Sequence, residues 1–130
     1  MFSRVFSGTV VKGAGRGKDL GFPTANLGLT KIDCEDGIYA AKATVQGKMW
    51  NALVFVGAAI TFSETVRQVE AYLLDFKGDI YGEQVEIVIL QKIRDNIKFN
   101  SKGALVLRMQ EDEQVARRFF ADQKNQSQQH

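Results

Sequence analysis

Cysteine and histidine are almost absent from this sequence, and their scarcity excludes several kinds of site. The single cysteine, Cys34, has no partner for an internal disulfide and indicates a reducing compartment. Its acidic neighbours Asp33, Glu35 and Asp36 disfavour the thiolate, so we expect an inert thiol. The single histidine, His130, lies at the C-terminal end. We therefore expect neither a zinc site of Cys and His ligands nor a mechanism with a catalytic histidine inside the fold.

Long apolar runs and a strong charge of one sign are missing too. No apolar stretch reaches the roughly 20 residues of a membrane-spanning helix, and residues 1–4 lead into a strand-like run without a signal-peptide pattern. The net charge is only +2, and the basic residues form no stripe of the kind that binds nucleic acid. The 130 residues suffice for one domain with a hydrophobic core. We expect a cytoplasmic monomer with no membrane or nucleic-acid partner.

The sequence does contain a series of short apolar runs separated by glycine turns. Strands are predicted over residues 5–12, 38–45, 49–57, 67–76 and 83–92. Tight turns at 46–48 and 77–79 join neighbouring runs, and the segment 22–27 around the only proline is expected to be extended or turned. This pattern predicts a mainly β fold in which an antiparallel sheet closes into a small barrel.

One helix is predicted over residues 101 to 122, with Ser101 as a candidate N-cap. Asp112 interrupts its apolar face, which consists of Leu105, Met109, Ala116, Phe119 and Phe120. Residues 123–130 are polar and are expected to form a disordered tail. The folded domain is therefore assigned to residues 1–122.

The glycine-rich loop from Gly13 to Lys18 is the first candidate binding element. Glycines let backbone N–H groups turn toward an anion, and Lys18 adds positive charge, so phosphate is a natural ligand. The loop is neither a Walker loop nor a dinucleotide fingerprint, because Asp19 follows the lysine and no helix follows the loop. From these residues alone a plain surface turn is the alternative, since most glycine-rich loops are only turns.

Thr24 and Asn26 are a second candidate, because residues two apart in an extended segment face the same side. A hydroxyl and an amide oxygen placed in this way suit a hard cation such as Mg²⁺, which takes few protein ligands and keeps several waters. The alternative is a turn in which the asparagine bonds its own backbone.

Glu70 is a carboxylate in an otherwise apolar strand. We expect it to share a strand face with Tyr72, Leu74 and Phe76. Partial desolvation on such a face raises the pKa of a carboxyl group, as a general base requires. An exposed charge at the rim of an edge strand is the alternative interpretation.

Five stretches of the chain together form a more specific pattern. They are GTVVKGAGRGKDLGFPTANL at 8–27, DGIYAA at 36–41, VEAYLLDF at 69–76, DIYGEQVEI at 79–87 and IRDNIKF at 93–99. In order and spacing this pattern resembles the riboflavin kinases over about residues 5–120, and Gly-Phe-Pro-Thr-Ala-Asn is its most specific part. The resemblance implies a six-stranded antiparallel closed β-barrel with one C-terminal α-helix.

The resemblance also implies roles for individual residues. It assigns ATP and its phosphates to Gly13, Gly15, Lys18, Thr24, Leu73, Asp75 and Tyr81. It assigns catalysis to Glu70, the metal to Thr24 and Asn26, and the flavin to Arg94 and Phe99.

The implied activity is ATP-dependent phosphorylation of riboflavin at its ribityl 5′-hydroxyl, which gives FMN and ADP, with Mg²⁺ as the cofactor. Phosphoryl transfer needs positioning and charge neutralisation more than covalent chemistry. Glu70 would accept the hydroxyl proton, while the loop 13–18 holds the phosphates. The chain has no His-x-Gly-His motif of the kind that adenylyltransferases use, so we expect no synthesis of FAD.

Departures from the family pattern leave a second function open. Ala59-Ile60-Thr61 replaces an Arg-Pro-Thr-like run, Asn96 stands where a glutamate is frequent, and the glycine loop is slightly shorter than in some relatives. The alternative function is a non-catalytic flavin- or nucleotide-binding barrel. The presence of Thr24, Asn26 and Glu70 favours the enzyme, since a binding protein needs neither a base nor a metal pair.

Overall fold

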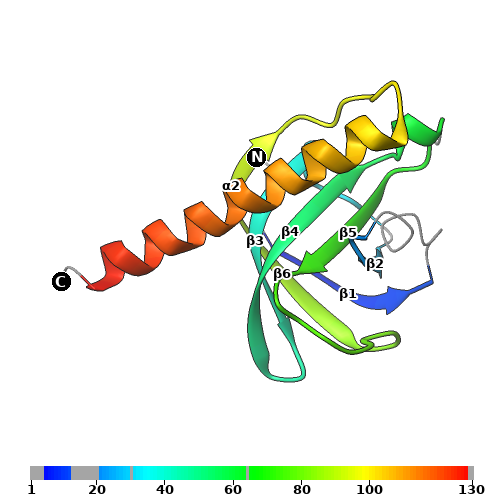
Figure 1. Ribbon diagram of the computed structural model, residues 1–130. Coiled ribbons are helices and arrows are strands. Elements are labelled where there is room, and N and C mark those ends of the chain that lie inside the picture. Colours follow the sequence, from blue (N-terminus) through cyan, green and yellow to red (C-terminus); the bar gives the residue numbers. More distant parts are fainter. Residues whose placement is uncertain (1–4, 13–20, 30, 64, 129–130) are drawn as a thin grey trace.

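The computed structural model describes residues 5–12, 21–29, 31–63 and 65–128, and within them the chain forms a closed barrel. The strands are β1 (Val5–Val11), β2 (Ala25–Gly28), β3 (Gly37–Val45), β4 (Lys48–Gly57), β5 (Gln68–Leu73) and β6 (Gln84–Arg94). Around the barrel they follow the order β1-β2-β5-β4-β3-β6, and every pair is antiparallel (Figure 1). The described residues also form a short 3₁₀ helix, η1 (Ile60–Phe62), and the helix α2 (Lys102–Gln128). The six-stranded barrel with a C-terminal helix is confirmed.

The barrel interior is filled by the side chains that strand alternation turns inward. In β1 and β5 every second residue is buried, as the period of two requires. Val54, Val56, Val69, Val85 and Ile87 lie at the centre, each at most 1% exposed. Burial of this apolar surface is the main force that closes the sheet.

A second core lies outside the barrel, between its outer face and α2. It contains Ile38, Ala40, Leu53, Leu74, Ala116 and Phe120. The first five residues of β3 are consecutively buried because the barrel interior covers one face and α2 covers the other. Figure 1 shows α2 crossing the barrel and its C-terminal half extending beyond it.

Helix α2 begins as expected and ends later than expected. The Ser101 hydroxyl accepts a hydrogen bond from the Ala104 N–H at 3.1 Å, which confirms the predicted N-cap. The helix continues to Gln128, so the expected end at 122 is wrong and residues 123–128 are helical rather than disordered. No Gly or Pro follows Gly103 within the helix, and Lys and Gln are good helix formers. The domain boundary at 122 itself stays a prediction.

One expectation is made more specific by the structure and another is wrong. Residues 25–28 form a strand, β2, and this supplies the sixth strand of the barrel. Strand β5 ends at Leu73 rather than at 76, because Asp75 adopts a positive φ of 61° and turns the chain. Aspartate is one of the few residues that tolerate this left-handed conformation. Within the described part of the chain, no helix is long and apolar enough to span a bilayer.

Candidate active site

Directly opposed residues on five neighbouring strands form one row across the barrel. This row contains three of the predicted site residues. Asn26 of β2 lies opposite Glu70 of β5, and Glu70 also lies opposite Phe55 of β4. The row continues through Ile38 of β3 to Arg94 of β6. Directly opposed residues of an antiparallel pair project to the same face of the sheet. The barrel therefore places these five side chains on its outer face, where α2 packs against β3, β4 and β6.

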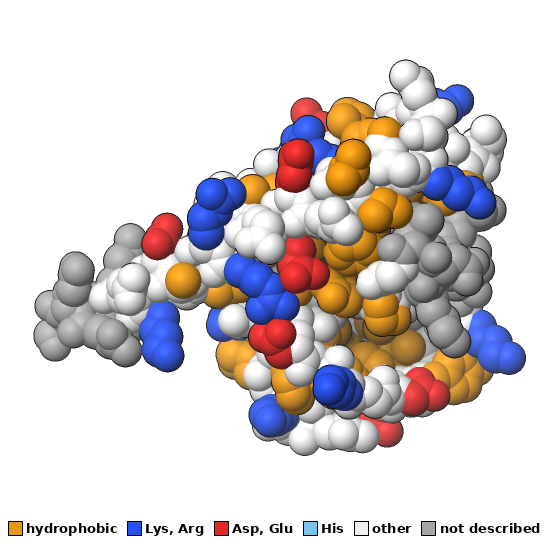
Figure 2. All heavy atoms as spheres, viewed as in Figure 1, with side chains coloured by type: hydrophobic (Ala, Val, Ile, Leu, Met, Phe, Trp, Pro, Cys, Tyr) orange, Lys and Arg blue, Asp and Glu red, His pale blue; other side chains and the backbone are white. Residues whose placement is uncertain are grey.

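Part of this row opens into a pocket beside α2, which we call the helix-side pocket. Its lining consists of Thr24, Ile38, Phe55, Val56, residues 57–62, Gln68, Glu70, Arg94, Asn96, Ile97, Phe99, Leu105 and Met109. Figure 2 shows hydrophobic side chains gathered beside α2 and over β5. Most of the lining is apolar, and Glu70 and Arg94 are its charged members. Such a lining suits a flat ring system with a few fixed polar contacts.

Glu70 is half-buried, but its neighbours differ from the expected ones. Strand alternation turns Val69, Ala71 and Leu73 into the barrel, so Glu70 shares the outer face with Gln68 and Tyr72. Strand β5 ends before Leu74 and Phe76. Leu74 still packs in the outer core beside Tyr72, as expected for that face, whereas Phe76 packs against the barrel interior, so the expectation for Phe76 is wrong. The Glu70 carboxylate still lines the mostly apolar helix-side pocket.

Arg94 lies in the helix-side pocket with its guanidinium held by α2. Its Nε donates to both carboxylate oxygens of Asp112, at 2.9 and 3.0 Å, and its Nη2 lies 2.8 Å from Oδ2. The guanidinium carbon lies 5.4 Å from the centroid of the Phe99 ring. The predicted flavin residues, Arg94 and Phe99, are therefore in contact with each other. Sequence reasoning missed Asp112, although a single carboxylate within the apolar face of a helix was the available signal.

The two segments that depart from the family pattern touch each other. Asn96 Nδ2 donates to the Ala58 carbonyl at 2.9 Å, and the Phe99 N–H donates to Thr61 Oγ1 at 3.2 Å. Gly57 makes the close approach possible, because a Cβ there would lie 2.9 Å from Asn96 Nδ2. The loop after β4 and the segment 94–99 thus form one wall of the helix-side pocket.

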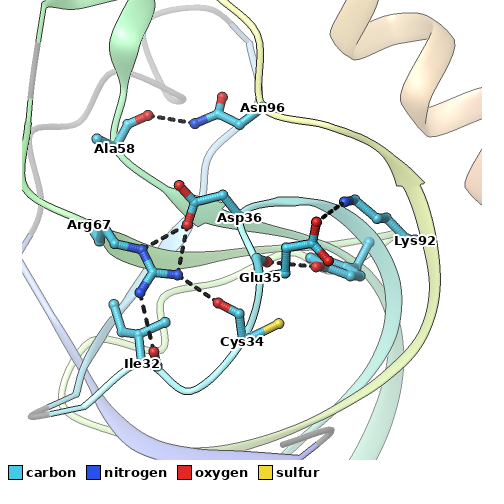
Figure 3. A network of polar contacts seen from close by, with 9 residues as sticks. Ile32, Cys34, Glu35, Asp36, Ala58, Arg67, Lys92 and Asn96 are labelled. Atoms are coloured by element: carbon cyan, nitrogen blue, oxygen red, sulfur yellow. Dashed lines mark hydrogen bonds and ion pairs between the residues drawn. The ribbon is translucent and has the colours of Figure 1, made fainter. Parts of the chain in front are cut away.

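A polar network holds the segment that leads into β3, next to this wall. Arg67 donates to Asp36 Oδ1 at 2.7 Å, to the Cys34 carbonyl at 2.6 Å and to the Ile32 carbonyl at 3.2 Å. Figure 3 shows these residues around the Arg67 guanidinium, with Asn96 and Ala58 nearby. The Arg67 side chain therefore holds the segment 32–36, which leads into β3, at three positions.

Tyr39 holds the same segment from inside the barrel. Its hydroxyl donates to the Glu35 carbonyl at 2.6 Å, and its side chain is buried. Burial, with a smaller contribution from the hydrogen bond and charge of Cys34, raises the pKa of Tyr39 to about 12. The neutral phenol is therefore the form that the fold stabilises.

A second pocket lies on the other side of Thr24, and we call it the nucleotide-side pocket. Its lining consists of Val10, Val11, Lys12, Pro23, Thr24, Ala25, Asn26, Ala71, Tyr72, Leu73, Phe76, Gly78, Asp79, Ile80 and Tyr81. Leu73 and Tyr81, predicted to lie near the nucleotide, meet here. Thr24 lines both pockets, so the two pockets adjoin.

Asp75, the other described residue predicted near the nucleotide, does not line this pocket. Its carboxylate pairs with the Arg117 guanidinium of α2, with contacts of 2.9 and 3.1 Å. The hydrogen bond and the charge of Arg117 lower the pKa of Asp75. Arg117 also bonds Glu113 at 3.0 Å, so this side of α2 is tied to the end of β5. Gly13, Gly15 and Lys18 lie outside the described residues.

Thr24 and Asn26 fit a magnesium–nucleotide complex better than a metal held by protein alone. Asn26 Nδ2 donates to Gln68 Oε1 at 3.4 Å. No group of three or more His, Cys, Asp or Glu side chains suited to a metal occurs in the described ranges. Mg²⁺ usually keeps several waters and takes few protein ligands beside the phosphates of a substrate, so two protein oxygens are enough when a nucleotide supplies the rest.

Comparisons with known proteins agree with this geometry. The riboflavin kinase (Flavokinase) family model matches residues 2–120. A trifunctional protein RibF/MnmA of Mycoplasmoides gallisepticum is 40% identical over 118 residues, which cover 89% of this chain and 18% of that protein. A bifunctional riboflavin kinase/FMN adenylyltransferase of Listeria monocytogenes is 39% identical over 117 residues, covering 88% of this chain and 37% of that protein.

A solved structure, riboflavin kinase from Trypanosoma brucei, matches with a TM-score of 0.69 and 27% identity. The match covers 95% of this chain and 80% of the trypanosomal one. The chain spans 18% and 37% of the lengths of the two curated relatives above. A family match over nearly its whole length shows that this chain belongs to the riboflavin kinase family.

Proposed function

We propose that this chain transfers the γ-phosphoryl group of ATP to the ribityl 5′-hydroxyl of riboflavin, giving FMN and ADP. The observation that carries the proposal is the position of Glu70 and Asn26 as register partners where two pockets adjoin. Glu70 lines the helix-side pocket, Asn26 lines the nucleotide-side pocket, and Thr24 lines both. A reaction between two bound substrates requires this arrangement.

The helix-side pocket is the proposed flavin site. The isoalloxazine ring is large and apolar, and Phe55, Phe99 and Met109 offer apolar surface for it. With the ring held there, the ribityl chain extends toward Glu70 and its hydroxyl meets the carboxylate. Arg94 and Phe99 close this pocket on the side of the 94–99 segment.

The nucleotide-side pocket is the proposed site of ATP. Leu73 and Tyr81 lie against the nucleotide, and the loop with Gly13, Gly15 and Lys18 holds its phosphates, while a role of Asp75 near the nucleotide stays a prediction. Thr24 and Asn26 would bind Mg²⁺, which offsets the charge on the phosphate oxygens. Asn26 Nδ2 donates to Gln68 Oε1, and Oδ1 of the same amide is the proposed ligand atom.

Glu70 is the proposed general base. It accepts the proton of the 5′-hydroxyl while the bond from this oxygen to the γ-phosphorus forms. The bond between the γ-phosphorus and the bridging oxygen breaks in the same step, and ADP leaves with that oxygen. General base catalysis of this kind contributes about 10²–10⁴-fold to the rate. The single cysteine supports a reducing compartment, and we propose the cytoplasm as the place of the reaction.

The proposal is tested by incubating the purified chain with riboflavin, ATP and Mg²⁺ and separating the flavins by chromatography. We expect FMN in proportion to the ADP released, and no FAD. Riboflavin or FMN bound tightly without formation of FMN would favour the non-catalytic flavin-binding barrel instead. Omission of ATP or of the divalent metal is the matched control, and each omission should abolish the product.

A further inference from the structure

Asp112 is an unusual residue for its place in the fold. It is 1% exposed, and the buried residues of its helix face are otherwise the apolar Met109, Ala116 and Phe120. A carboxylate inside an apolar face is costly to bury unless its charge is paired and its oxygens accept hydrogen bonds. The free-energy cost of burying this carboxylate indicates that Asp112 has a role other than filling space in the core.

The partner of Asp112 is Arg94, on the last position of β6. The Arg94 side chain is 7% exposed, and its Nε and Nη2 both contact the carboxylate at distances between 2.8 and 3.0 Å. Arg108, one turn earlier on α2, adds a longer contact of 3.7 Å to Asp112 Oδ1. A planar guanidinium that donates to a carboxylate through two of its nitrogens has little freedom to rotate.

The fixed guanidinium in turn supports the wall of the helix-side pocket. Its Nη1 donates to the Asp95 carbonyl at 3.1 Å, and its Cζ lies 5.4 Å from the Phe99 ring centroid. Arg94 and Phe99 both line the helix-side pocket, and Asp112 does not. The contacts therefore run from α2 through Arg94 to the aromatic wall of the pocket.

We infer that Asp112 is a positioning residue for the flavin: it holds Arg94, and through Arg94 the Phe99 ring, in the orientation that receives the isoalloxazine. This inference rests on the proposed function, because it concerns the flavin side of the same site. Asp112 lines neither the helix-side pocket nor the nucleotide-side pocket, and the proposed ATP site lies on the opposite side of Thr24.

A purely structural role makes a different prediction. A buried ion pair contributes little to stability compared with apolar residues of similar volume, so its replacement by such residues is often neutral or stabilising. The double variant Arg94→Met/Asp112→Leu therefore keeps the fold while it removes the oriented guanidinium. If the pair serves only stability, this variant binds riboflavin as the wild type does.

The experiment compares the wild type with Asp112→Asn, with Arg94→Met/Asp112→Leu and with Glu111→Gln as the matched control. Glu111 is the neighbouring acid on α2, and its side chain is 71% exposed. The dissociation constant of riboflavin is measured by quenching of flavin fluorescence, together with KM for riboflavin, KM for ATP and Tm.

Asp112→Asn and the double variant should raise the riboflavin Kd and KM at least about tenfold, since small misplacements of a binding group have effects of this order or larger. KM for ATP should stay within about twofold in all variants, and Glu111→Gln should behave as the wild type, as surface substitutions usually do.

A folded double variant with the wild-type riboflavin Kd overturns the inference. A wild type that binds riboflavin but makes no FMN contradicts the proposed function alone, because the Kd comparison still tests Asp112.

Discussion

Asn26 and Glu70 face each other across the antiparallel strands β2 and β5 as register partners. The Cβ atoms of such a pair lie about 4.5–5.5 Å apart, so the amide and the carboxylate reach the same small volume. The ladder of a closed barrel fixes this spacing, and no loop has to move to create it. The proposed metal ligand and the proposed base are therefore preorganised by the sheet.

The first prediction concerns the use of Mg²⁺. Asn26→Ala removes one oxygen ligand, so the Mg²⁺ concentration for half-maximal rate should rise at least about tenfold, a cost common for groups that support a metal site. The measurement is the rate of FMN formation against Mg²⁺ at fixed ATP. Asn125→Ala, at an exposed position of α2, is the control. An unchanged Mg²⁺ dependence in Asn26→Ala would remove Asn26 from the metal site.

The second prediction concerns the core between the barrel and α2. Leu53 is fully buried there, so Leu53→Ala should lower the free energy of unfolding by about 2–5 kcal/mol. Leu107 is 64% exposed, and Leu107→Ala should change this free energy by about 0.5 kcal/mol or less. Urea unfolding followed by circular dichroism measures both. Equal effects of the two substitutions would mean that α2 does not depend on this core.

The third prediction concerns Gly57. Its φ of 133° is unfavourable for other residues, and an added Cβ would press on Asn96 Nδ2 at 2.9 Å and on Asp36 Cγ at 3.1 Å. Gly57→Ala should displace the 94–99 segment and raise KM for riboflavin about tenfold.

Gly47→Ala is the matched control for this substitution. Gly47 also has a positive φ, of 75°, but an added Cβ there meets nothing within 4 Å. Its replacement should destabilise the fold by about 1 kcal/mol and leave KM for riboflavin unchanged. If both variants shift KM equally, backbone strain and not the contact with Asn96 is the cause.

The fourth prediction concerns stability at alkaline pH. The folded chain raises the pKa of Tyr39 to about 12, while the unfolded chain has the ordinary value of about 10. Between these values the unfolded chain has lost the proton and the folded chain still holds it. Stability from this group is therefore complete below about pH 10 and is lost as the pH rises toward 12.

Urea unfolding between pH 9 and pH 11.5 tests this prediction. The free energy of unfolding of the wild type should fall more steeply with pH than that of Tyr39→Phe. Tyr81→Phe is the control, since Tyr81 is 59% exposed, and it should follow the wild type. Parallel curves for the wild type and Tyr39→Phe would show that Tyr39 does not cause the loss.

The barrel could be predicted from local pattern because each strand carries its own signal. The alternation around Val85 and Ile87 and the turn at Gly47 are visible within a few residues. The end of β5 could not be predicted in this way, since apolar residues continue past Leu73 while the backbone turns at Asp75. The polar end of α2 was misjudged because composition alone does not separate a solvated helix from a disordered tail.

The sequence predicted part of the candidate site. It did not predict the tertiary contacts that hold the site residues in place. The sequence pattern identified Glu70, Arg94 and Phe99, and the structure brings all three to one pocket. The sequence pattern did not identify the pairing of Arg94 with Asp112. The two residues lie on a strand and a helix, and no regular sequence spacing predicts a contact between two such elements. The interruption of the apolar helix face was visible, but its partner was not.

The central claim is that Glu70 is the base of a riboflavin kinase. The most direct test is the rate of FMN formation by Glu70→Gln beside the wild type and Glu86→Gln, an exposed glutamate of β6. Glu70→Gln should lose about 10²–10⁴-fold in kcat and keep its Tm and its riboflavin Kd, while Glu86→Gln keeps full activity. A folded Glu70→Gln variant with a kcat near that of the wild type would contradict the claim.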